Sequence, residues 1–96
     1  MMAVSSQDLV GRGVYSREGD RVGTIKELIF ERDYVVVRRL LSTLVVPVRA
    51  LEWSGDRLVI PHTSSYLDMA PKVDTKHPLS AHDRSLLEHF YLPHAA

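Results

Sequence analysis

The chain has 96 residues, with 12 basic and 12 acidic side chains, five histidines and no cysteine. This length fits one domain with a modest core, and a zero net charge argues against an autonomous nucleic-acid binder, which usually carries a basic excess. The lack of cysteine excludes disulfides, thiolate nucleophiles and thiolate metal sites, while 45% hydrophobic and 25% charged residues are typical of a folded protein.

The N-terminal residues show no targeting signal. Residues 1–8 have neither the basic region nor the apolar run of a signal peptide, and no segment approaches the ~20 apolar residues that cross a bilayer. We therefore expect a cytoplasmic protein without a transmembrane segment. Residues 1–8 are predicted to be a loose lead-in, with Ser6 capping a short helical turn over residues 7–10 that Gly11 ends.

Two strands joined by a tight turn are predicted next. The first covers residues 13–16, and Gly19 supplies the positive φ that a tight hairpin turn needs. The second covers residues 22–30, where the apolar residues do not alternate strictly, so a bulge or kink is expected near Gly23 or residues 26–27. A helix is the competing interpretation of this stretch, because its apolar residues also fit a helical period.

Shorter β segments follow. β-branched and aromatic residues predict a strand over residues 34–41, which Ser42 and Thr43 break. Pro47 has no backbone N–H to donate, so it must lie at a strand end, an edge or a bulge. The other predicted features are strands over 44–48, 52–53 and 57–60, a bend over 49–51 and a three-residue loop over 54–56.

The last third of the chain changes character. A short helix is predicted over residues 63–70, with Thr or Ser as its N-cap, and a proline-bounded linker over residues 71–78. Ser80 is the predicted N-cap of a final helix that extends to Tyr91. Helical spacing places four apolar residues on one face of this helix: Leu86, Leu87, Phe90 and Tyr91.

Five or six short strands followed by small helices predict a mainly β fold. Closure into a small β-barrel of SH3-like size would hide strand edges that otherwise pair with other molecules. The predicted divisions of the chain are a lead-in over residues 1–8, the barrel domain over 9–74 and a C-terminal helical extension over 75–96.

Five stretches carry a resemblance to a known family. They read LVGRGVY at residues 9–15, EGDRVGTIKELIF at 18–30, LVVPVRAL at 44–51, GDRLVIP at 55–61 and APKVD at 70–74. Their order and spacing resemble those of the PRC-barrel family. The resemblance implies a small β-barrel that relatives, among them a photosynthetic reaction-centre subunit and a ribosome maturation factor, use as an adaptor or assembly module. It implies no catalytic residue, no cofactor and no enzymatic activity.

No chemical site is predicted from the motifs. The histidines, at positions 62, 77, 82, 89 and 94, include no pair four residues apart and no HExxH arrangement, so no metal site is assigned. His82 and His89 could share a helix face, where solvated histidines are more common than ligands. No serine lies in a G-x-S-x-G elbow, and the glycines form no phosphate-binding loop.

Two hypotheses for function remain. The first is a non-enzymatic protein-binding or assembly module, homo-oligomeric because a small core gains from burying a further apolar face. Its candidate partner interface comprises Trp53, Leu86, Phe90 and Tyr91. The alternative is an RNA- or ribosome-associated accessory factor, which rests on the ribosomal relative and on Arg38, Arg39, Arg49 and Arg57.

Overall fold

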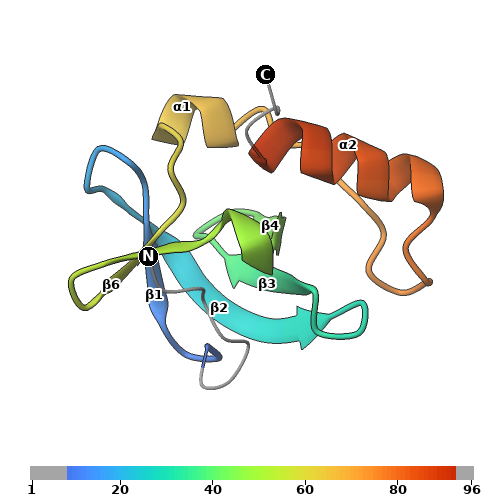
Figure 1. Ribbon diagram of the computed structural model, residues 1–96, viewed down its shortest axis with the longest axis horizontal. Coiled ribbons are helices and arrows are strands. Elements are labelled where there is room, and N and C mark those ends of the chain that lie inside the picture. The colour runs from blue at the N-terminus through green and yellow to red at the C-terminus, as the bar shows by residue number, and fades with distance from the viewer. Residues whose placement is uncertain (1–8, 93–96) are drawn as a thin grey trace.

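The computed structural model describes residues 9–92, so the lead-in and most of the helical turn expected around Ser6 lie outside it. Along the described residues, strands alternate with turns and two helices follow them (Figure 1). The elements are β1 (Gly13–Tyr15), β2 (Arg21–Ile29), β3 (Tyr34–Arg38), β4 (Thr43–Pro47), the 3-10 helix η1 (Val48–Ala50), β5 (Glu52–Ser54), β6 (Arg57–Val59), α1 (Ser64–Leu67) and α2 (Ala81–Tyr91). The mainly β prediction is confirmed.

The six strands form one sheet in the order β4-β3-β2-β1-β6-β5. Neighbours are antiparallel except β1 and β6, which run parallel. The sheet is strongly curled (Figure 1), but it is not closed into a barrel, since β4 and β5 remain its two edges. Closure by a continuous ladder was therefore a wrong expectation. β4 ends at Pro47, which has no N–H to donate, and η1 turns the chain directly into the three-residue β5.

β2 curves because it contains two bulges. Val14 pairs with Gly23 while Tyr15 pairs with Arg21, so one residue of β2 lies between two consecutive partners on β1. On the other side, the register with β3 shifts between Ile25 and Glu27. An extra residue bends a strand and increases its twist. The sequence predicted a bulge or kink near Gly23 or residues 26–27, and the structure has a bulge at each of these places. The helical alternative for this stretch is wrong.

Gly23 is required by a close backbone approach. A Cβ built on Gly23 would collide with the carbonyl oxygen of Arg38 on β3 and would lie 2.9 Å from its carbonyl carbon. Because the clash is with backbone, no side-chain rotation relieves it. The glycine therefore allows β2 and β3 to pair at the bulge.

β3 and β4 are buried on both of their faces. Residues 34–37 and 44–47 are buried without alternation, although successive strand residues point to opposite sides of a sheet. One side lines the curled interior, and α2 packs on the other, where it contacts β4 and where Tyr34 donates a hydrogen bond to Glu88. The continuous apolar runs in the sequence thus have a cover on each side.

Several predicted boundaries differ from the structure. β3 ends at Arg38 because the Arg39 N–H donates to the Ser42 carbonyl (2.8 Å) and closes a hairpin, so Leu40 and Leu41 form its tip. The β5–β6 turn has two residues instead of three. Pro47 is the last residue of an edge strand, as predicted.

The helices begin at the expected caps. Thr63 Oγ1 accepts from the Tyr66 N–H (3.2 Å), and Ser80 Oγ accepts from the Asp83 N–H (3.0 Å). α1 is a single turn, within the one or two turns predicted, and α2 matches its predicted span. Within residues 9–92, no helix has the length and apolar character needed to cross a membrane.

The β2–β3 turn holds three consecutive residues in the left-handed region. Phe30, Glu31 and Arg32 have φ of 52°, 60° and 69°, which costs non-glycine residues roughly 1–2 kcal/mol each. The Asp33 N–H donates to the Phe30 carbonyl (3.1 Å), and the Phe30 ring meets Tyr34 edge-on at 5.7 Å. Local hydrogen bonds and ring packing therefore hold a turn that glycine would form at lower cost.

We expect Gly23→Ala to lower the free energy of unfolding by about 2–3 kcal/mol, because the added methyl group forces β2 and β3 apart. Gly13→Ala is the matched control. There the added Cβ meets only the flexible guanidinium of Arg21, so the change should be below about 1 kcal/mol. Urea unfolding of both variants measures the difference, and equal losses would contradict the backbone clash.

Candidate functional site

The four residues of the predicted partner interface do not form one outward surface. Leu87 and Tyr91 of α2 are fully buried, and Phe90 is half-buried, while Leu86 is 42% exposed. Trp53 lies half-buried on β5, with the guanidinium of Arg12 5.0 Å above its ring. The apolar face of α2 is thus turned towards the sheet, and Leu86 is the most exposed member of the set.

Phe90 and Tyr91 belong to an aromatic cluster that joins α2 to α1. Tyr66 stacks on Phe90 with ring centroids 4.2 Å apart and also donates its hydroxyl to the Phe90 carbonyl (2.6 Å). His62 stacks on Tyr66 at 4.7 Å and lies 2.7 Å from the Tyr91 carbonyl through Nε2, which must donate because a carbonyl only accepts. These contacts fix the end of α2. The rings stack on one another, so the stacked faces are not open to a partner.

The Tyr91 hydroxyl is the unusual member of this cluster. It is buried and has no hydrogen-bond partner among residues 9–92. Burial raises the pKa of the Tyr91 phenol well above its ordinary value. A buried hydroxyl without a partner costs about 1–3 kcal/mol. Burial of the apolar ring has to offset this cost.

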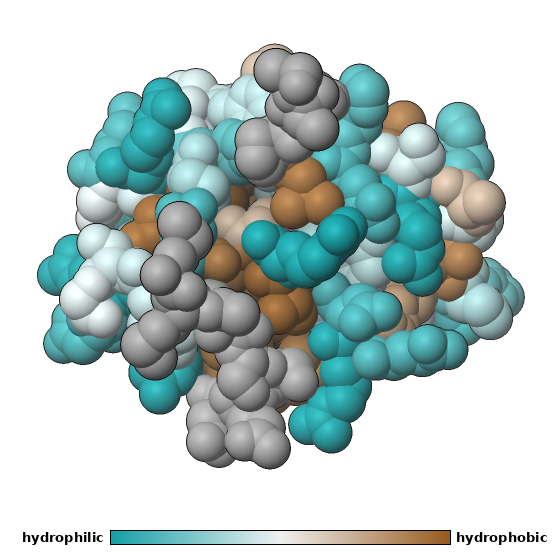
Figure 2. Space-filling view, in the orientation of Figure 1, coloured by the Kyte–Doolittle hydropathy of each residue, from teal (hydrophilic) through white to brown (hydrophobic). Residues whose placement is uncertain are grey.

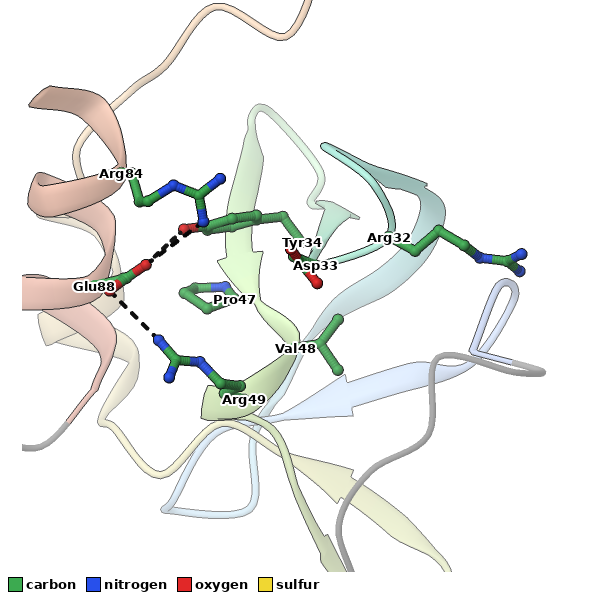
Figure 3. A pocket seen from close by; sticks show the side chains of 8 residues that line it. All are labelled: Arg32, Asp33, Tyr34, Pro47, Val48, Arg49, Arg84 and Glu88. Carbon is green, nitrogen blue, oxygen red and sulfur yellow. Dashed lines mark hydrogen bonds and ion pairs between the residues drawn. The ribbon is translucent and has the colours of Figure 1, made fainter. Parts of the chain in front are cut away.

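A polar cluster between α2 and the sheet lines a pocket of about 390 Å³ (Figure 3). Glu88 lies at its centre. It accepts from the Tyr34 hydroxyl (3.2 Å) and forms ion pairs with Arg49 (3.4 Å) and Arg84 (3.8 Å). Arg32 also lines the pocket but points away from the other side chains in Figure 3. The cluster ties α2 to β3 and η1.

The environment of Tyr34 agrees with this structural role. Burial, and then the neighbouring Glu88 carboxylate, raise the pKa of the Tyr34 phenol above its ordinary value. The Arg84 guanidinium lies 5.7 Å from the Tyr34 ring centroid. The positive charges of Arg49 and Arg84 offset the negative charge of Glu88, so the cluster holds α2 against the sheet.

The histidines lie apart from one another where the structure describes them. His62 is part of the aromatic cluster, and His77 contacts Asp74 (3.5 Å) in the linker. Residues 9–92 contain no group of three histidine, cysteine or carboxylate side chains that could hold a metal ion. His94 lies outside the described residues.

The arginines proposed for an RNA-binding surface also do not gather. Arg39 pairs with Asp68 (2.8 Å), and Arg49 pairs with Glu88. Arg57 lies over the Tyr15 ring at 4.5 Å. Two of the four predicted arginines are therefore engaged in ion pairs.

The β3–β4 hairpin tip is the most exposed apolar feature of the described chain. Leu40 and Leu41 are 95% and 93% exposed, and Met69, just after α1, is 69% exposed. The ion pair between Arg39 and Asp68 links the base of this tip to the end of α1. The sequence assigned both leucines to a strand that Ser42 and Thr43 break, so their exposure was missed.

A groove of about 310 Å³ runs beside the tip. Its apolar lining comes from Leu41, Val45, Pro71 and Val73, which bring the tip and the linker after α1 together. We call Leu40, Leu41, Met69 and this groove the tip surface. It places an apolar projection directly beside a recess that Ser42, Thr43 and Lys72 also line, so the lining of the recess is of mixed polarity. Figure 2 shows an apolar area near the centre of the viewed face, with hydrophilic side chains along its right-hand border.

We expect Tyr91→Phe to raise the free energy of unfolding by about 1 kcal/mol, because it removes a buried hydroxyl without a partner. Tyr66→Phe is the matched change in the same cluster and should lower that free energy by about 1 kcal/mol, because it removes a 2.6 Å hydrogen bond. Thermal and urea unfolding measure both. A loss of stability in Tyr91→Phe equal to that in Tyr66→Phe would mean that the Tyr91 hydroxyl is bonded.

Comparison with known proteins agrees with the resemblance found in the sequence. No curated protein matches the chain significantly. The sequence profile of one family, described as PRC-barrel domain, matches residues 1–75. This segment contains every strand of the curled sheet and the α1 helix. The chain belongs to the PRC-barrel domain family.

Proposed function

We propose that this PRC-barrel protein is a non-enzymatic assembly module whose protein partner is a second copy of itself, bound through the tip surface. The observation that carries the proposal is the exposure of Leu40 and Leu41, at 95% and 93%, on a hairpin whose flanking strands are buried. Exposed apolar patches on a soluble domain commonly mark interaction sites. A zero net charge also leaves little repulsion between copies.

The tip surface is suited to a symmetric contact. Its projection, Leu40 and Leu41, lies beside its recess, where apolar Val45, Pro71 and Val73 alternate with polar residues. In a two-fold dimer the same patch serves both partners, so the tip of each copy would enter the groove of the other. A projection and recess on one patch satisfy this requirement without a change of shape.

The energetics predict a weak dimer. Burial of an exposed leucine contributes roughly 1.5–3 kcal/mol, so the four tip leucines of two copies supply roughly 6–12 kcal/mol. Association itself costs roughly 4–15 kcal/mol. The two sums overlap, and the groove contacts decide the balance. We therefore expect association that depends strongly on protein concentration.

The hairpin is held in shape before a partner arrives. The Arg39–Ser42 backbone bond closes it, and the 2.8 Å ion pair between Arg39 and Asp68 ties it to α1. Less conformational entropy is then lost on binding. The RNA-associated alternative has weaker support, because Arg39 and Arg49 already pair with carboxylates. We also propose that the protein is located in the cytoplasm.

We expect the double variant Leu40→Gln/Leu41→Gln to be monomeric at concentrations where the native chain dimerises, with unchanged stability because both side chains are exposed. Leu86→Gln is the matched control on α2 and should still dimerise. Sedimentation equilibrium measures all three. A native chain that stays monomeric at millimolar concentration would contradict self-assembly. Loss of the dimer only in Leu86→Gln would place the interface on α2.

A further inference from the structure

We infer that the two copies of the proposed dimer join through β4, whose free edge pairs antiparallel with the same edge of the other copy into one continuous sheet. This pairing rests on the proposed self-assembly through the tip surface and assigns its contact to named backbone groups. β4 is one of the two edges of the curled sheet. Its outward hydrogen-bonding groups have no partner among residues 9–92.

The hydrogen bonds of the β3–β4 hairpin show which backbone groups of β4 point outward. Bonded and non-bonded positions alternate along an antiparallel pair. The Val48 N–H, just beyond β4, donates to the Asp33 carbonyl (2.9 Å), and the hairpin bond at the other end of the strand fits the same alternation. The even-numbered residues of β4 therefore bond to β3, while the odd-numbered ones face away: Thr43, Val45 and Pro47.

Val45 is the residue whose outward groups most need a partner. It is only 6% exposed, yet its outward N–H and C=O form no hydrogen bond with any other described residue. Backbone groups shielded from water are paired in nearly all native structures. A strand added to β4 would supply both missing bonds, because the open edge of a sheet is a template for pairing with another chain.

The linker after α1 lies beside this edge without pairing with it. Pro71, Lys72 and Val73 line the groove of about 310 Å³ together with Thr43 and Val45. Within the described part of the chain, no backbone hydrogen bond joins these linker residues to β4, and Pro71 has no N–H to donate. The groove therefore gives an incoming strand access to the unpaired edge.

Pro47 selects the register of the pairing. A two-fold axis at the edge pairs β4 with itself, so the residue at the centre lies opposite its own copy. A centre at Val45 would place Thr43 opposite Pro47, which has no N–H to donate. A centre at Thr43 would place Val45 opposite Leu41, which lies outside the strand. A centre at Leu44 instead pairs Thr43 with Val45 of the other copy, where each residue has an N–H and a C=O to exchange.

The register centred on Leu44 also uses the tip leucines. It lays Leu41 of each copy opposite Pro47 of the other, so each tip passes the groove that Val45 lines. The apolar contact of the tip and the backbone bonds of the edge thus belong to one interface.

The test is a mixture of isotope-labelled and unlabelled full-length chain, in which filtered NMR detects only contacts between copies. Leu44 and its copy occupy a non-hydrogen-bonded pair, where the two Cα atoms lie about 4.5 Å apart. We expect a contact between their Hα atoms at concentrations where sedimentation equilibrium shows the dimer. A dimer whose tip leucines contact the groove without this Leu44 contact would overturn edge pairing and leave the proposed self-assembly standing. A chain that stays monomeric would overturn both.

Thr43→Pro removes an outward N–H without removing a bond to β3. We expect it to weaken the dimer about tenfold, because each copy loses one hydrogen bond at the interface. Thr43→Val is the matched control, since it keeps both the N–H and the β-branched shape, and it should dimerise as the native chain does. Undiminished dimerisation of a folded Thr43→Pro variant would contradict the backbone pairing. If Thr43→Pro does not fold, the Leu44 contact in the native chain decides the question.

Discussion

The structure depends on covering β3 and β4 from both sides. Four consecutive buried residues in each strand leave no solvent face, so a curled sheet alone would expose half of them. α2 supplies the missing cover with Leu87 and Tyr91, both fully buried. At roughly 1.5–3 kcal/mol for each buried side chain, these two contacts are large beside the net stability expected of a small domain.

The polar contacts of α2 agree with this role. Glu88 accepts a hydrogen bond from the Tyr34 hydroxyl and pairs with Arg49 and Arg84. His62 and Tyr66 donate hydrogen bonds to carbonyls at the C-terminal end of the helix. The family match ends at residue 75, before α2 begins. The helix that completes the core therefore follows the segment by which the family is recognised. Core residues and their hydrogen bonds lie on both sides of the predicted boundary between residues 74 and 75.

The sequence predicted those features that local chemistry decides. An out-of-step apolar pattern and one glycine located both bulges of β2, and Ser80 located the start of α2. Non-local features were missed. The parallel pairing of β1 with β6 and the open edges have no local signal. The turn at Phe30 adopts a left-handed conformation without glycine, which propensity argues against.

The surfaces show the same division. Helical spacing found the apolar face of α2, but it could not tell that the sheet already covers Tyr91. The sequence predicted a strand at Leu40 and Leu41. They are exposed because the hairpin closes at Arg39 and leaves them at its tip. Arg21 and Arg57 are far apart in the sequence but line one pocket, because β1 pairs with both of their strands. Which side chains gather is thus decided by topology.

Native-state hydrogen exchange tests most directly whether α2 is part of the core. We predict that the amides of Leu87 and Tyr91 exchange through an opening whose free energy lies within about 1 kcal/mol of that for Val35 and Val37, because all four side chains belong to one buried core. The contradicting result is an α2 that exchanges several kcal/mol more readily while β3 stays fully protected.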